Sequence, residues 1–164
     1  MSRSNCFVEV LCVLLVVLLI TTGCVGKASN QKASNQHEVK KVGIDEGAKV
    51  LFNIEKVSTS FGYFSVEGWG VIKDRDSKNT QYFIVLSSAK KTYFFDTKQD
   101  GKRPDVTDYF KKLKDYDDSG YSALIKKDSL EPGVYQVGIY MQQDGVYAQK
   151  MSDKYVTIKR FWIF

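Results

Sequence analysis

The stretch Val134–Met141, VYQVGIYM, followed by Asp144-Gly145, decides the fold class of this chain of 164 residues. Every second side chain in it is large and apolar: Tyr135, Val137, Ile139 and Met141. This alternation is typical of a half-buried β-strand, because successive side chains of a strand point to opposite faces. Asp-Gly between two apolar runs is a strong hairpin signal, since glycine adopts positive φ without steric cost. The stretch therefore predicts a strand, a tight turn and a returning strand.

Similar stretches recur from residue 47 onward. Short runs rich in Val, Ile, Tyr and Phe lie at residues 50–55, 64–71, 81–86, 92–96, 121–126 and 155–164. Turn-forming residues separate them, among them the polar loop Asp74–Asn79 and Glu131-Pro132-Gly133. Short strands divided by such turns indicate an all-β sandwich or barrel.

One segment predicts a helix. Tyr109, Phe110 and Leu113 fall on one helical face, and lysines follow where positive charge suits the helix dipole. Asp105 stands where an N-cap residue is expected. We expect a short crossover helix over Val106–Leu113 that connects strands of opposite sheets.

The first 24 residues predict export. Arg3 precedes an apolar run over residues 6–20, and small residues lead from there to Cys24. A basic start, an apolar run and small residues at the cut are the signature of a secretory signal. With cysteine at the cut, the segment resembles the lipobox of bacterial lipoproteins. The resemblance implies that residues 1–23 are removed and that Cys24 is acylated, which would hold the protein at the membrane outside the cytoplasm.

Two alternatives stay open for this segment. Phe7–Val25 has about the length of a bilayer span, roughly 20 residues, so it also fits an uncleaved anchor helix. Glu9 and the polar Thr21-Thr22 argue against that alternative. The other alternative is an ordinary cleaved signal. All three cysteines of the chain lie here, so no disulfide or cysteine metal site is expected in the folded part.

Residues 24–46 are expected to form a disordered linker behind the lipidated cysteine. Lys27–Gln31 and Lys32–Gln36 repeat the sequence KASNQ, whose small polar residues have nothing to bury. The folded domain is then expected to span residues 47–164.

An ordered set of short motifs adds a second resemblance. The motifs are Gly68-Trp69-Gly70, Arg103–Val106, Ser119–Ala123, Leu130–Tyr135 and Ser152-Asp153-Lys154. Together they resemble small extracytoplasmic domains of surface and envelope proteins of Gram-positive bacteria. The resemblance covers residues 47–159 and implies an immunoglobulin-like β-sandwich and a location. It implies no activity.

The residues that usually carry catalysis are scarce. The single histidine, His37, lies in the expected linker, so neither a Ser-His nor a Cys-His arrangement nor a histidine metal site is predicted. No glycine-rich phosphate loop follows a strand. No cofactor is expected. Carboxylates are plentiful, and an extracytoplasmic carbohydrate-active enzyme that uses paired acids is therefore the alternative function.

A basic and aromatic surface is the predicted means of binding. The chain carries a net charge of +5 and contains ten Tyr, ten Phe and two Trp. Lysines suit anionic polymer or lipid, and exposed rings suit a sugar or a protein partner. A solvated surface and a packed core are the competing interpretations. The predicted contact residues are Trp69, Tyr93, Phe95, Lys111, Lys112 and Lys114.

A calcium loop is a further hypothesis. Asp115, Asp117 and Ser119 take the first, third and fifth positions of such a loop. The twelfth position holds Lys126 where a glutamate is needed, so a polar bend explains the segment as well.

The sequence thus favours a non-catalytic lipoprotein of the cell envelope. Its partners would be the membrane, through the lipid anchor, and a wall glycan, an anionic polymer or a surface protein. Nucleic acid is not an expected partner of an exported domain. Binding to an anionic polymer would weaken as salt rises, because exposed charges are screened over about 10 Å at 0.1 M.

Overall fold

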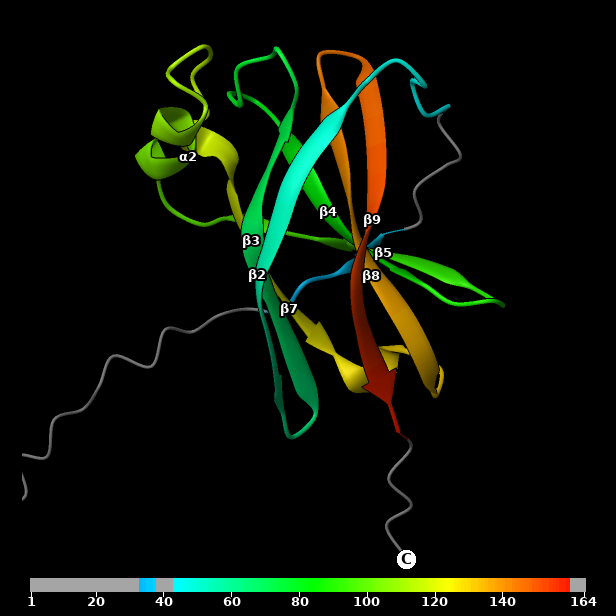
Figure 1. Cartoon of the computed structure of the whole chain (residues 1–164). Helices are drawn as coiled ribbons and strands as arrows, with labels where there is room; N and C mark the ends of the chain where they lie inside the picture. Colours follow the sequence, from blue (N-terminus) through cyan, green and yellow to red (C-terminus); the bar gives the residue numbers. More distant parts are fainter. Residues whose placement is uncertain (1–32, 38–42, 160–164) are drawn as a thin grey trace, which may run out of the picture. The chain divides into compact units, whose positions relative to one another are not determined.

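Two antiparallel sheets enclose the core (Figure 1). The computed structural model describes residues 33–37 and 43–159. One sheet has the strand order β1-β5-β4-β8-β9 and the other β2-β3-β7-β6, so the predicted all-β sandwich is confirmed. The elements are β1 (Gln36–His37), β2 (Val50–Ser60), β3 (Tyr63–Ile72), β4 (Gln81–Ser87), β5 (Thr92–Asp96), β6 (Lys98–Gln99), α2 (Pro104–Tyr109), the 3₁₀ turn η1 (Asp117–Ser119), β7 (Gly120–Lys126), the 3₁₀ turn η2 (Lys127–Ser129), β8 (Gly133–Gln143) and β9 (Val146–Ile158).

The hairpin predicted from VYQVGIYM is formed by β8 and β9. Gln143 pairs with Val146 across a two-residue turn. Asp144 and Gly145 both have positive φ, 47° and 78°, as the favoured two-residue hairpin turn requires. The four alternating apolar side chains of β8 all point into the core, where each is at most 2% exposed.

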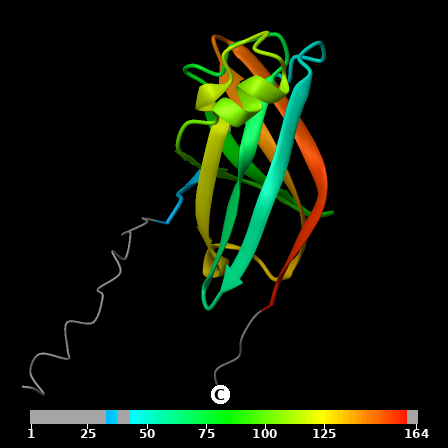
Figure 2. The same cartoon turned by 60° about the vertical axis from the view of Figure 1, so that its left-hand side comes forward.

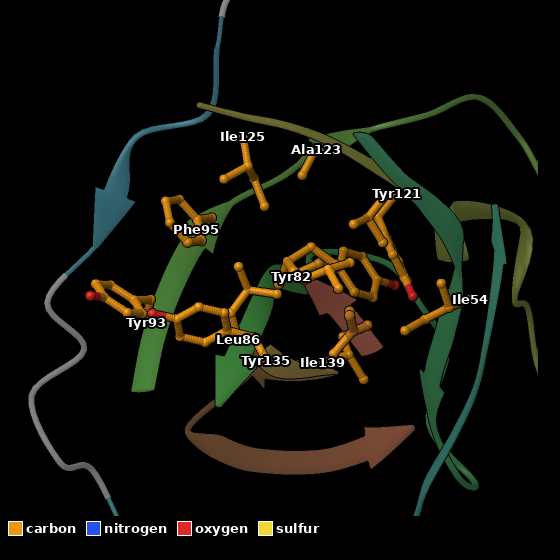
Figure 3. Packing of buried hydrophobic residues seen from close by; sticks show 14 of the residues in the cluster. Ile54, Tyr82, Leu86, Tyr93, Phe95, Tyr121, Ala123, Ile125, Tyr135 and Ile139 are labelled. Carbon is orange, nitrogen blue, oxygen red and sulfur yellow. The ribbon is translucent and has the colours of Figure 1, made fainter. Parts of the chain in front are cut away.

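Large aromatic and branched side chains from both sheets fill the core (Figure 3). Tyr82 of one sheet lies against Tyr121 of the other, with ring centroids 5.7 Å apart. The Tyr82 hydroxyl donates to the Asp118 carbonyl at 3.3 Å and the Tyr121 hydroxyl to that of Asn53 at 3.5 Å. Burial raises the pKa of both phenols, so the two rings act as neutral core residues that also tie down backbone.

Two β-bulges in the edge strands change the direction in which nearby side chains point. Between Ile54 and Lys56 the register of β2 shifts, which leaves Glu55 as a bulge residue. On β9, residues 152–154 form a larger bulge, because Gln136 pairs with Tyr155 while Gly138 pairs with Met151. Ser152 closes this bulge by donating from Oγ to the Val137 carbonyl at 2.6 Å.

The seam between β2 and β9 is closed by lysines. Both strands are edge strands, one from each sheet. Lys150 Nζ lies 3.4 Å from the carbonyl oxygen of Val50, and Lys154 Nζ lies 2.5 Å from that of Ile54. The ammonium groups therefore occupy carbonyl acceptors that edge strand β2 leaves without a strand partner.

Part of the predicted linker belongs to the sheet. Gln36 and His37 pair with Phe95 and Phe94 of β5, and Ser34 donates its amide to the Leu124 carbonyl at 2.7 Å. The expectation of disorder over the whole of residues 24–46 was therefore wrong for this stretch. Backbone hydrogen bonds depend little on side-chain type, so a polar repeat can still add a short strand to an exposed edge. The other residues of the predicted linker up to 32, and 38–42, lie outside the described residues.

The helix differs from its prediction in its bounds and in the strands that it connects. It spans Pro104–Tyr109 and ends before Leu113, because Lys111 and Lys112 have positive φ of 58° and 55°. It connects β6 and β7 of the same sheet. The chain changes sheets earlier, at Thr97 between β5 and β6, where the Thr97 hydroxyl donates to the Tyr82 carbonyl at 2.9 Å.

Candidate functional site

The sandwich has two ends of different character (Figures 1 and 2). We call the end that carries α2 the helix end; it comprises residues 43–49, 73–80, 100–119 and 143–146. The opposite end, which carries the β2–β3 turn, is the hairpin end; it comprises residues 60–63, 126–133 and 158–159. We count with it residues 88–91, the β4–β5 turn, which projects from the side of the sandwich (Figure 1) and is joined to this end by the ion pair of Lys91 with Glu131. Nine basic and eleven acidic residues lie at the helix end, against five lysines and two acids at the hairpin end.

Arg103 organises the helix end. Its guanidinium donates to both carboxylate oxygens of Glu55, at 2.8 and 3.0 Å, and to both of Asp105, at 2.9 and 2.7 Å. The bulge in β2 is what brings Glu55 to this point. The arginine side chain is 19% exposed. This double fork fastens the start of α2 to the edge of β2.

The same contacts decide the charge states. Hydrogen bonding to Asp105 and then to Glu55 raises the pKa of Arg103, while Arg103 holds the pKa of Asp105 below its ordinary value. A glycosidase acid instead needs a carboxyl group that keeps its proton near neutral pH. Arg103 therefore lowers the pKa of Asp105, whereas the alternative function, a carbohydrate-active enzyme, needs an acid whose pKa is raised.

Asp105 is not the helix cap that its position predicts. The N-cap residue is Arg103, and no side chain caps the first turn. Asp105 lies inside that first turn, where the ion pair with Arg103 engages both of its oxygens. The capping prediction was wrong because the guanidinium is a stronger partner than a neutral backbone amide.

The acidic loop after α2 is held by internal hydrogen bonds. Asp117 accepts from the Thr107 hydroxyl at 2.6 Å, and Asp115 accepts from the Asp117 amide at 3.0 Å. Asp118 accepts from Lys102 at 2.5 Å. Among residues 33–37 and 43–159, no group of three or more His, Cys, Asp or Glu is arranged to hold a metal ion. The calcium hypothesis for Asp115, Asp117 and Ser119 stays a prediction, and the hydrogen bonds of Asp115 and Asp117 fit the polar bend that is its alternative.

Trp69 belongs to a small aromatic cluster under α2. Its ring meets that of Phe110 edge-on at 6.0 Å, and Phe110 meets Tyr116 edge-on at 5.4 Å. Tyr116 is buried, whereas Trp69 and Phe110 are half-buried. Trp69 thus supports the helix from below and is not an open platform for a ligand.

The outer side of the same cluster is exposed. Tyr109 packs edge-on against Phe110 at 4.9 Å, yet it is 76% exposed, and Leu113 is exposed to the same extent. Lys111, Lys112 and Lys114 are exposed beside them, and Lys112 pairs with Asp108 at 3.4 Å. The structure thus brings the three predicted lysines together with two apolar side chains. The sequence placed these two on one helical face with Phe110.

Tyr93 and Phe95 lie in the core and not on the surface (Figure 3). Tyr93 is 3% exposed and Phe95 is fully buried, so their assignment as contact residues was wrong. Phe94, between them, points to the outer face and packs edge-on against Tyr140 at 5.8 Å. The strand has aromatic side chains on both faces, as the sequence indicates, but the outer one is covered by a neighbouring ring.

The hairpin end carries the most exposed large apolar side chain of the described residues. Phe61, 90% exposed, is at the tip of the β2–β3 turn beside Gly62, which has a φ of 76°. A groove of about 320 Å³ borders it. The lining residues are Phe61, Gly62, Lys127, Asp128, Leu130, Pro132, Ile158 and Lys159. Sequence reasoning missed this site, although a phenylalanine beside a turn glycine, between two strands, is a readable signal.

Cys24 and the predicted signal lie outside the described residues. Within the part of the chain that the structure describes, no helix is long and apolar enough to cross a membrane. Comparisons with protein-family models, curated proteins and solved structures found no match to this chain.

Proposed function

We propose that the protein is a non-catalytic binding module of the bacterial cell envelope, held outside the cytoplasm at the membrane by a lipid on Cys24. In this proposal residues 1–23 are removed as a signal and the folded domain is an immunoglobulin-like sandwich. The order of basic, apolar and small residues before Cys24 supports the location. The motif set from Gly68-Trp69-Gly70 to Ser152-Asp153-Lys154 supports the type of fold.

The observation that carries the binding role is the exposed pair Tyr109 and Leu113. Large exposed apolar side chains that lie close together in the sequence are typical of an interaction surface. The ring of Tyr109 rests on Phe110, and Arg103 fastens the start of the same helix to β2. These contacts hold the surface in place before a partner binds, which lowers the conformational entropy lost on binding.

The charges around this pair favour one class of ligand. Lys111, Lys112 and Lys114 lie close to Asp108 and Asp115, within an end where acids outnumber bases. A polyanion would be repelled by the acids, whereas a protein surface of mixed charge can complement both signs. Of a wall glycan, an anionic polymer and a surface protein, the surface protein therefore fits this end best.

Sedimentation with purified Gram-positive walls tests the proposal. The walls are used intact, after extraction of anionic polymer and after proteolysis, and the supernatant is assayed for released sugar. We expect binding to intact and extracted walls, loss after proteolysis, and no released sugar. Joint replacement Tyr109→Ser and Leu113→Ser should weaken binding by at least about tenfold, since each side chain buries apolar area on contact.

Tyr155→Ser is the matched control, because Tyr155 is also exposed, at 62%, but lies on β9 away from α2. Binding that survives the double replacement would place the contact surface elsewhere. Absence of binding to every wall fraction would contradict the proposed function, and steady release of sugar would favour the carboxylate enzyme.

A further inference from the structure

We propose that the hairpin end binds the anionic surface of a phospholipid bilayer. The proposal rests on the membrane-tethered location proposed above, and it adds a second, direct contact between the folded domain and the membrane. Two observations carry it: the excess of positive charge at this end and the exposed phenylalanine at its tip.

The hairpin end has a net positive charge. Its five lysines are Lys90, Lys91, Lys126, Lys127 and Lys159, and its acids are Asp128 and Glu131. One acid is already engaged, since Glu131 pairs with Lys91 at 3.1 Å. Lysines near an anionic leaflet each contribute about 1 kcal/mol of attraction at low ionic strength. The helix end, where acids exceed bases, has no comparable attraction.

The exposed apolar side chain of this end lies at its tip, where it can contact a bilayer. The turn between the long strands β2 and β3 lies at this end of the sandwich (Figure 1). Phe61 lies in that turn, and its side chain is 90% exposed. Lys127 holds the turn by donating from Nζ to the Ser60 carbonyl at 2.7 Å, and its amide donates to the Gly62 carbonyl at 2.9 Å. An aromatic ring at the tip of a turn, next to lysines, suits the boundary between head groups and acyl chains, where aromatic side chains concentrate.

The sequence that follows has matching chemistry. The described chain ends at Lys159, which lines the groove next to Phe61. The next residues are Arg160-Phe161-Trp162-Ile163-Phe164, one base and four large apolar residues. Basic and aromatic residues of this kind favour a membrane interface over a hydrated polysaccharide, which offers no apolar phase to Phe61.

The test uses the full chain in vesicles of phosphatidylcholine, with and without phosphatidylglycerol. Flotation first measures whether the chain is held on vesicles at all. Hydrogen exchange then compares the segments 58–64 and 126–133 of the hairpin end with the segment 106–114 of the helix end. We expect slower exchange at the hairpin end only, on anionic vesicles only, and less so at high salt. A photoactivatable phospholipid should label the region of Phe61 and not that of Tyr109.

Three variants sharpen the result. Lys126→Gln with Lys159→Gln should lower the ratio of docked to free domain about thirtyfold, as expected for two lost lysine contacts. Phe61→Ser should reduce lipid labelling, whereas Tyr109→Ser, the matched control at the helix end, should leave it unchanged. Circular dichroism confirms that each variant is folded.

The outcomes separate the two proposals. A chain that does not float contradicts the membrane-tethered location. A chain that floats, with equal exchange at both ends and no labelling near Phe61, overturns the docking proposal and leaves the location intact. Equal protection on neutral and anionic vesicles also overturns it, because the excess of lysine would then have no role.

Discussion

The helix end and the hairpin end close the same two sheets in opposite ways. At the helix end several polar side chains bond to other parts of the chain, as the contacts of Arg103, Thr107 and Asp118 illustrate. At the hairpin end lysines outnumber acids and Phe61 is exposed. The difference indicates that ion pairs and hydrogen bonds within the chain shape the helix end, whereas the hairpin end leaves an excess of positive charge and one aromatic ring exposed.

The largest expected contrast is between two phenylalanines. Phe95 is fully buried between the sheets, so Phe95→Ala should lower the free energy of unfolding by about 3–5 kcal/mol. Phe61→Ala at the hairpin tip should change it by less than about 0.5 kcal/mol. Urea denaturation of both variants measures this. A stability loss of similar size in Phe61→Ala would mean that the tip is part of the core, and the contrast between the ends would break.

Removal of the central arginine should come next. Arg103→Ala leaves Glu55 and Asp105 facing each other without their shared cation, and we expect a loss of about 2 kcal/mol. Arg103→Lys should recover only part of it, because an ammonium cannot form two forks. Lys159→Ala at the hairpin end serves as control and should stay within about 0.5 kcal/mol. Near-ultraviolet circular dichroism of Trp69 should report loosening of α2; an unchanged spectrum with unchanged stability would show that the clamp is dispensable.

A smaller effect is expected at Thr107. Its hydroxyl donates to Asp117 at 2.6 Å and accepts from the Tyr116 amide at 2.9 Å. Thr107→Val keeps the shape and removes both bonds, which should cost about 1–2 kcal/mol. Thr157→Val, on exposed strand β9, should be neutral or slightly stabilising. Equal melting temperatures for the two variants would argue that the hydrogen bonds of the helix end do not stabilise it.

The smallest effect depends on pH. The folded pKa of Asp105 is lowered from its ordinary value of 3.8 by Arg103, so this ion pair stabilises the fold fully above that value. As the pH falls below it, the unfolded state gains a proton before the folded state does, and the contribution is lost. Asp105 is 64% exposed, so only a few tenths of a kcal/mol are expected. Asp105→Asn should therefore flatten the acid limb of a stability–pH curve slightly; an unchanged limb would contradict the lowered pKa.

Strands could be predicted from the sequence because their signal is local. Tyr135, Val137, Ile139 and Met141 alternate, and Asp144-Gly145 has few conformations other than a tight turn. The place where the chain changes sheets, at Thr97, carries no such local mark, since it depends on how the completed sheets stack. The short strand β1 was not predicted, because it pairs through backbone groups that almost every residue type has.

The candidate surfaces were harder to predict for a related reason. Composition shows that aromatic residues are abundant, but not which ring is covered. Tyr93 and Phe95 face the other sheet, whereas Phe61 and Tyr109 are largely exposed. The lysines 111, 112 and 114 were placed together correctly because they are close in sequence. The lysines of the hairpin end come from two turns and from the end of β9, and only the fold brings them together.

The lysines on the β2–β9 seam affect whether the β2 edges of two copies of the domain can pair. A free strand edge offers carbonyl oxygens to any passing chain, and edge-to-edge pairing is a common route to aggregation. Lys150 and Lys154 already occupy the carbonyls of Val50 and Ile54, and they add positive charge that repels a second copy of the same edge. The β2 edge is thus protected against strand addition by a second copy of the same edge.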